Sequence, residues 1–138
     1  MAANYKLGQF EAALEKFCLQ AGFKSHRWGG GVKATRNLIE VLAKQPTILY
    51  VKESNIGEGF WGVNQNQLAA VMSSGKKWAL ILLLGPGDTA FAMLGSAVQN
   101  AMKSWSHDKS DYKVHEGQEL STAVKFSSYV TACEWVLK

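Results

Sequence analysis

Scarce residues set the first limits on what this chain does. It has only two cysteines, Cys18 and Cys133, which excludes a disulfide-rich scaffold. Both fall on apolar helix faces, where buried free thiols are expected. Apolar runs are short: the longest spans residues 78–84, far below the roughly 20 residues that cross a bilayer. We therefore expect no membrane association. The acids and histidines between residues 107 and 119 lack a compact zinc pattern.

The overall composition is that of an ordinary globular protein. Hydrophobic residues make up 47% of the chain and charged residues 19%, which argues against disorder. A length of 138 residues suits one domain. The start of the chain holds no apolar run suited to a signal peptide, so we expect a cytosolic protein. The net charge of +4 favours polyanionic partners only mildly, because solubility alone accounts for such a value.

Arginine is also scarce, and its placement is informative. Arg27 and Arg36, the two arginines of the chain, flank three successive glycines at 29–31, and no acid occurs between Glu15 and Glu40. Glycine backbone amides can approach phosphates, and an aromatic ring can stack on an unpaired base. We predict that nucleic acid contacts this segment through Lys24, Arg27, Trp28, Lys33 and Arg36. The alternative is a solvated loop that joins a helix to a sheet.

Apolar periodicity predicts a single α/β (α+β) domain with a mixed central sheet flanked by helices. Its expected elements are a helix at 9–21 ended by Gly22, strands at 38–42, 47–53 and 60–63, a helix at 65–74 capped by Asn64, and a strand at 78–84. The last of these lacks polar alternation, so we expect it in the centre of the sheet. These elements have the order α-β-β-β-α-β.

The second half of the chain predicts the order β-α-β-α. Its expected elements are a strand at 89–94, a helix from Ser96 to about Trp105, a polar loop at 106–111, an edge strand at 112–115 and a last helix capped by Ser128. Within the single domain of residues 1–138, we assign residues 9–94 to the core and residues 95–138 to a C-terminal extension.

The first half of the chain contains, in this order, FEAALEKFCLQAGF, NLIEVLA, TILYVKES, GFWGV, NQNQLAAVMSSG and WALILLL. This order resembles the core of the restriction-endonuclease-like fold, the PD-(D/E)XK nuclease superfamily. In that family a helix precedes a hairpin with an acid on one strand and an acid-x-Lys on the next, and a strand, a helix and a strand follow. The chain also resembles short bacterial proteins of unassigned function with a similar YVK…GFWG…N…L…W pattern.

The resemblance implies a Mg²⁺-dependent endonuclease site. Glu11 matches the helix acid that helps to hold the metal, Glu40 the first strand acid, and Lys52 the lysine. Mg²⁺ can be held by one or two carboxylates together with substrate phosphate, and a lysine can orient the attacking water or neutralise developing charge. The position two before Lys52 is acidic in the family and is Tyr50 here. We therefore expect weak or lost phosphodiesterase activity.

The hairpin itself sets the expected geometry of this site. A turn centred near Lys44 and Gln45 places Glu40 opposite Tyr50, and Lys52 then lies on the same face at a diagonal distance of about 7–8 Å. The alternative is that Glu40 and Lys52 form a cross-strand pair at the sheet surface.

Three functions remain open from the sequence. The first is a metal-dependent nuclease, and the second is a nuclease-like fold that has lost catalysis and binds DNA or RNA through the basic segment. The third is a protein-interaction or small-ligand-binding module, with a homodimer as one form, in which exposed aromatic residues make the interface. Tyr50 favours the second function over the first, and the two closely placed arginines favour either over the third.

Overall fold

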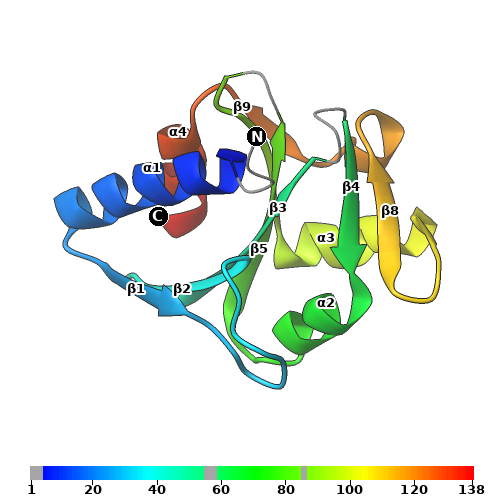
Figure 1. Cartoon of the computed structure of the whole chain (residues 1–138), viewed down its shortest axis with the longest axis horizontal. Helices are drawn as coiled ribbons and strands as arrows, with labels where there is room; N and C mark the ends of the chain where they lie inside the picture. The colour runs from blue at the N-terminus through cyan, green and yellow to red at the C-terminus, as the bar shows by residue number, and fades with distance from the viewer. Residues whose placement is uncertain (1–4, 55–58, 85–86) are drawn as a thin grey trace.

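A six-stranded mixed sheet runs through the middle of the molecule, and helices cover both of its faces (Figure 1). This computed structural model of the whole chain describes residues 5–54, 59–84 and 87–138. Only β3 and β5 are parallel; the other neighbouring strands are antiparallel. The strand order is β1 (Lys24–Arg27), β2 (Leu38–Leu42), β3 (Thr47–Glu53), β5 (Lys77–Leu84), β6 (Thr89–Leu94) and β9 (Val124–Phe126).

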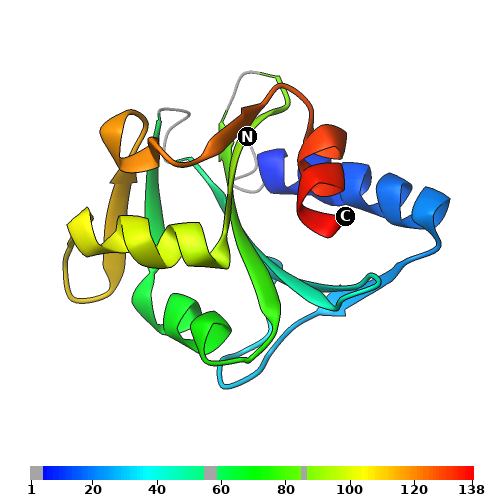
Figure 2. The same ribbon diagram turned by 180° about the vertical axis from the view of Figure 1, so that it is seen from behind.

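The helices and a second sheet lie on the two sides of the central sheet, as the front and rear views agree (Figures 1 and 2). One face is covered by α1 (Tyr5–Ala21) and α4 (Tyr129–Leu137), which pack against each other. The other face is covered by α2 (Gln65–Met72), α3 (Gly95–Ala101) and a three-stranded antiparallel sheet. That sheet has the order β4 (Phe60–Asn64), β8 (Asp111–His115) and β7 (Ser106–His107). Two short 3-10 helices complete the described elements, η2 (Met102–Ser104) and η3 (Gln118–Leu120).

Alternation along β5 divides its side chains between two hydrophobic cores. Ile81 and Leu83 contact the core under α1 and α4, whereas Leu80 and Leu82 contact the core under α2 and the second sheet. All four side chains are fully buried. A strand covered on both faces needs an apolar residue at every position. The prediction of a central strand at 78–84 is therefore confirmed.

Several local predictions are confirmed because they rest on neighbouring residues alone. Gly22 ends α1 with a φ of 77°, and the N–H of Phe23 donates to the carbonyl oxygen of Cys18 at 2.9 Å, as in a Schellman turn. The side chain of Asn64 accepts a hydrogen bond from the backbone N–H of Gln67 at the start of α2. Both cysteines are buried and free, and burial raises the pKa of Cys133 to about 12.

The prediction that residues 60–63 join the central sheet is wrong. The two neighbours of β3 are β2 and β5, so no place beside β3 is left for β4. The strand β4 pairs instead with β8, and Trp61 lies opposite Val114 in this pairing. The indole N–H of Trp61 donates to the carbonyl oxygen of Leu83 at 3.0 Å, which holds the second sheet against the central one.

Three other segments also differ from the predictions. Residues 112–115 were expected at an edge, but β8 is the middle strand of the second sheet, and β7 forms within the expected polar loop 106–111. Backbone pairing between β7 and β8 accounts for both differences, and sequence alternation does not reveal such pairing. The helix expected at 96–105 consists of α3 followed by η2.

Residues 95–138, predicted as an extension, supply strands to both sheets and the helix α4 that packs on α1. No helix in the described part of the chain is long and apolar enough to cross a bilayer.

Candidate nucleic-acid interface

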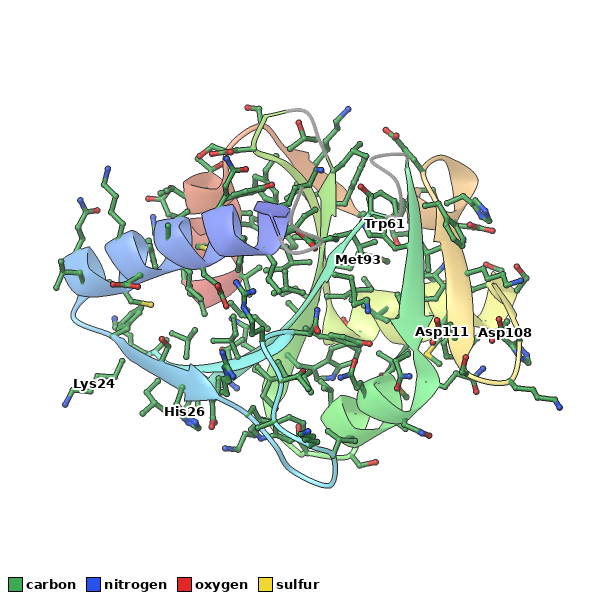
Figure 3. All side chains as sticks on the ribbon, viewed as in Figure 1. Lys24, His26, Trp61, Met93, Asp108 and Asp111 are labelled. Carbon is green, nitrogen blue, oxygen red and sulfur yellow. The ribbon has the colours of Figure 1, made fainter. Side chains whose placement is uncertain are left out.

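The basic segment predicted to contact nucleic acid forms one edge of the central sheet. Residues 24–27 were expected within a polar connection, but they form β1, which pairs with β2. All four side chains are exposed (Figure 3 shows Lys24 and His26 at this edge). Because side chains alternate along a strand, Lys24 and His26 lie on the α2 side of the sheet. Arg27 lies on the α1 side, where it lines a hollow with Glu11.

A cleft of about 640 Å³ lies between the glycine-rich loop after β1 and helix α2. The loop lines it with residues 28 and 30–32, and α2 with the segment that follows it lines the opposite wall with Asn66, Ala69, Ala70, Ser73, Ser74 and Lys76. Lys33 is exposed next to the loop wall. The cleft therefore combines a glycine backbone, serine hydroxyl groups and the ammonium group of Lys76, and groups of these kinds are the usual partners of phosphate oxygens.

Trp28 lines the cleft, but its ring is not free to stack on a base. Its side chain is only 8% exposed and belongs to the core under α2. Gly30 crosses the indole so closely that a Cβ at position 30 would lie 2.5 Å from a ring carbon. The predicted stacking of Trp28 on a base would therefore need the glycine loop to move.

A buried carboxylate ties the basic side chains at this end of the sheet together. Glu40 is 3% exposed, although it was predicted as a metal ligand. Its Oε1 lies 2.9 Å from Nε2 of His26, and its Oε2 lies 2.5 Å from Nζ of Lys76. A buried carboxylate needs such partners, because burial removes its hydration. Glu40 thus holds His26 at the sheet edge and Lys76 at the end of the cleft.

The second predicted acid, Glu11, lies on the opposite side of the sheet. Its two carboxylate oxygens accept hydrogen bonds from the guanidinium of Arg36, at 2.5 Å and 3.2 Å. This contact raises the pKa of Arg36, with a smaller contribution from the nearby charge of Glu53. The carboxylate of Glu53 also accepts the N–H of Leu7 in the first turn of α1. The charge of Arg36 is therefore matched locally, and Arg36 differs in this respect from Arg27.

The expected hairpin register is wrong by two residues. Glu40 pairs with Ile48, and Tyr50 pairs with Leu38. Lys52 consequently lies four residues along β3 from the position opposite Glu40, which is a separation of about 13 Å along the strand. The observed pairs are centred on Lys44, one residue earlier than the centre that a Glu40–Tyr50 pair requires, and this moves the pairing by two residues. Glu40 and Lys52 share a face of the sheet but do not meet.

Lys52 points into the junction between the two sheets, where it lies near a different acid. Burial lowers the pKa of Lys52, and the nearby charges of Asp111 and Glu53 oppose this shift. On the same face Tyr50 is fully buried, and its hydroxyl accepts the backbone N–H of Asn64 at 2.9 Å. Burial raises the pKa of Tyr50 well above its usual range. Tyr50 thus joins β3 to the start of α2, which is a packing role.

These positions leave the predicted magnesium ligands apart. Glu11 and Glu40 lie on opposite faces of the sheet, and each is already in an ion pair, Glu11 with Arg36 and Glu40 with Lys76. Lys52 faces the α2 side, away from Glu11. In the ranges that the structure describes, no three side chains of the metal-binding types converge. The three residues therefore do not form the single site that the resemblance implied.

Sequence reasoning missed Lys76 and the helix α2 as parts of the cleft, and it missed His26 as a partner of Glu40 at the sheet edge. In the pairing of β1, β2, β3 and β5, His26, Glu40, Ile48 and Trp78 form one row across the sheet. Lys76 lies two residues before Trp78, directly before the start of β5, which brings it near Glu40. The sequence placed Arg36 and Lys44 four residues from Glu40, and it gave no signal that the actual partners are His26 and Lys76. Those partners depend on the order of the strands in the sheet.

Comparisons with known proteins agree with this architecture. No protein-family model matches the chain. No curated protein matches it in sequence. A solved structure of a Holliday junction resolvase from the archaeal hyperthermophile Archaeoglobus fulgidus is similar over 91% of this chain and 98% of that chain, with a TM-score of 0.56 and 14% sequence identity.

The chain has a nuclease-like fold. At 14% sequence identity, this structural similarity is evidence for a shared fold and not for the chemistry of the site. The part of the sequence prediction that concerns a nuclease-like architecture is therefore confirmed.

Proposed function

We propose that this protein binds nucleic acid at the edge of its central sheet and that its phosphodiesterase activity is weak or lost. The observation that carries the proposal is the set of exposed cations on the edge strand β1 and on the loop beside the cleft. Among the described residues, no carboxylate pairs with Lys24, Arg27 or Lys33. Cations without an ion-pair partner keep their charge available for phosphates, and phosphate contacts dominate nucleic-acid affinity.

The cleft supports a division of roles among these residues. In this proposal Lys24, on the α2 side of β1, and Lys33, on the loop, each contact a phosphate of one strand. Arg27 contacts the same strand from the other side of the edge. The glycine loop offers backbone N–H groups. Gly31 has a φ of 85°, a backbone conformation that residues other than glycine rarely adopt. Arg36 takes no part, because its guanidinium pairs with Glu11.

The similarity to a Holliday junction resolvase supports DNA as the first ligand to test. The experiment compares single-stranded DNA, duplex DNA, a four-way DNA junction and RNA by fluorescence anisotropy. The test variant is Lys24→Gln with Lys33→Gln, and the matched control is Lys103→Gln with Lys109→Gln, two exposed lysines outside the cleft. We expect binding by wild type and by the control, and weaker binding by the test variant. Absence of binding to every nucleic acid would refute the proposal.

We expect weak or lost cleavage because the two predicted metal ligands, Glu11 and Glu40, form ion pairs within the protein. Glu40 is paired with His26 and Lys76, and Glu11 with Arg36, so neither offers a free carboxylate to Mg²⁺. The test is nicking of DNA and RNA in Mg²⁺ or Mn²⁺ by wild type, Glu40→Ala and Lys52→Ala. We expect at most slow cleavage. Rapid metal-dependent cleavage by wild type would show that this part of the proposal is wrong.

A second candidate function is self-association at the opposite edge of the sheet. There β9 is the last strand, and Val124 and Trp135 are 37% and 39% exposed. The ring of Trp135 lies 5.8 Å from that of Phe126 between centroids, so the apolar side chains form one patch. An unpaired strand edge beside such a patch favours pairing with a second copy. Analytical ultracentrifugation of wild type and Trp135→Ser tests it: a dimer that persists in the variant would exclude this patch.

A further inference from the structure

A second cavity, of about 440 Å³, lies on the other side of the basic sheet end, where α1, α4 and the turn between β2 and β3 approach one another. Its walls include Phe17, Phe23 and Leu137, and its rim includes Lys44, Lys77 and Lys138. No carboxylate side chain lines it within the described ranges. Volumes of this size and walls of this kind are typical of small-molecule sites.

The aromatic wall is set by the turn that ends α1. Gly22 has a φ of 77°, and the Phe23 N–H bonds to the Cys18 carbonyl oxygen, so Phe23 is turned back over the last turns of the helix. Its ring lies 6.1 Å from the ring of Phe17 between centroids, at an interplanar angle of 62°. This contact holds two rings at the cavity wall without filling the space between α1 and α4.

The rim is positively charged, and one of its ammonium groups is fixed in place. Nζ of Lys77 donates to the carbonyl oxygen of Val136 at 2.6 Å, so this ammonium bridges the start of β5 and the end of α4. An ammonium group has three donors, so two remain for a ligand. Lys44 is exposed on the turn, and no acid among the described residues pairs with it. Lys138 lies 4.0 Å from Glu134, which is a weak contact.

We propose that this cavity binds a small soluble carboxylate that carries an apolar body. The apolar part lies against Phe17, Phe23 and Leu137, and the carboxylate lies between Lys44 and Lys77. Neutral ligands leave the ammonium rim without a partner, and short anions leave the apolar wall exposed to water. The inference is independent of nucleic-acid binding, because Lys24 and Lys33 do not line this cavity.

The test is isothermal titration calorimetry of the full chain with decanoate, decanol and acetate. We expect decanoate to bind at one site and more tightly than either other probe. Ala21→Trp places a large side chain at the cavity without removing a core residue, because Ala21 is exposed, and it should abolish decanoate binding. Lys44→Met should weaken decanoate binding about two- to fivefold, the range for an exposed ion pair. Lys103→Met and the Lys24→Gln, Lys33→Gln variant should bind decanoate as wild type does.

Three results would overturn the proposal. Equal affinity for decanol and decanoate would show that the ammonium rim does not select the charge. Wild-type affinity in a folded Ala21→Trp variant, with folding checked by circular dichroism, would show that decanoate binds elsewhere. The absence of decanoate binding would likewise refute it, without any bearing on nucleic-acid binding.

Discussion

The salt dependence of single-stranded DNA binding is the sharpest test of the proposed interface. The structure leaves Lys24, Arg27 and Lys33 without acid partners among the described residues, and we assign each of them one phosphate. Three phosphates on a single strand predict a slope of about −2 for the logarithm of the binding constant against that of salt. Between 50 and 200 mM salt the affinity should then fall about 20-fold. A duplex should give a steeper slope, about −2.7.

Removing two of these charges should change the slope and not only the affinity. In Lys24→Gln with Lys33→Gln, one phosphate contact remains, so we expect a slope of about −0.7 and a loss of about threefold over the same salt range. Both side chains are exposed, so the fold should not change. The control, Lys103→Gln with Lys109→Gln, has the same net charge and should keep the wild-type slope.

The assay is fluorescence anisotropy of a labelled oligonucleotide at five or more salt concentrations. A slope near −2 in the double variant would refute the assignment of Lys24 and Lys33 to phosphates. An equal change in the control would show that net charge, and not the position of the cations, sets the affinity. Both outcomes are distinct from unfolding, which circular dichroism of each variant detects.

Three further predictions concern residues whose roles the structure changed. Tyr50→Phe should lower the free energy of unfolding by about 1–3 kcal/mol in urea denaturation, because it leaves the buried N–H of Asn64 without an acceptor; a cost near zero would show that water replaces the hydroxyl. Burial depresses the pKa of Lys52 in the folded state, so the unfolded chain binds more protons below the unperturbed value of 10.5. Wild type should therefore gain stability relative to Lys52→Met as pH rises towards that value, and a flat difference would contradict this. Arg36→Ala should reduce stability slightly by breaking the contact with Glu11 and should leave the salt slope of DNA binding unchanged; a smaller slope would make Arg36 a phosphate contact.

The structure also changes the expected effect of restoring an acid at position 50. In the resemblance, a glutamate there would complete the acid-x-Lys pattern and raise activity. Tyr50 is fully buried in the core under α2, so Tyr50→Glu would place a carboxylate among apolar side chains. Burial of an unpaired charge costs several kcal/mol. We therefore expect an unfolded or strongly destabilised protein, measured by circular dichroism, and not a more active one.

Local sequence patterns determined most of the individual elements. The repeat of apolar residues in α1, the glycine that ends it and the Asn64 cap act within a few residues, so they are visible without a fold. The unbroken apolar run of β5 also indicated a strand covered on both faces. The basic segment was located from the positions of Lys and Arg in the sequence, because a local cluster of cations is visible without knowledge of the fold.

Only the tertiary structure decided which residues meet. A shift of two residues in the β2–β3 pairing separated Glu40 from Lys52, although the side chains still share a face. The order of strands brought His26 and Lys76 to Glu40, from positions 14 and 36 residues away in the chain. The strand β4 could join the central sheet beside β3 only if that edge of β3 were unpaired, and β5 pairs with it. Pairing register and strand order arise from contacts between distant segments, and for that reason the sequence identified most of the elements and the basic segment but not the composition of the site.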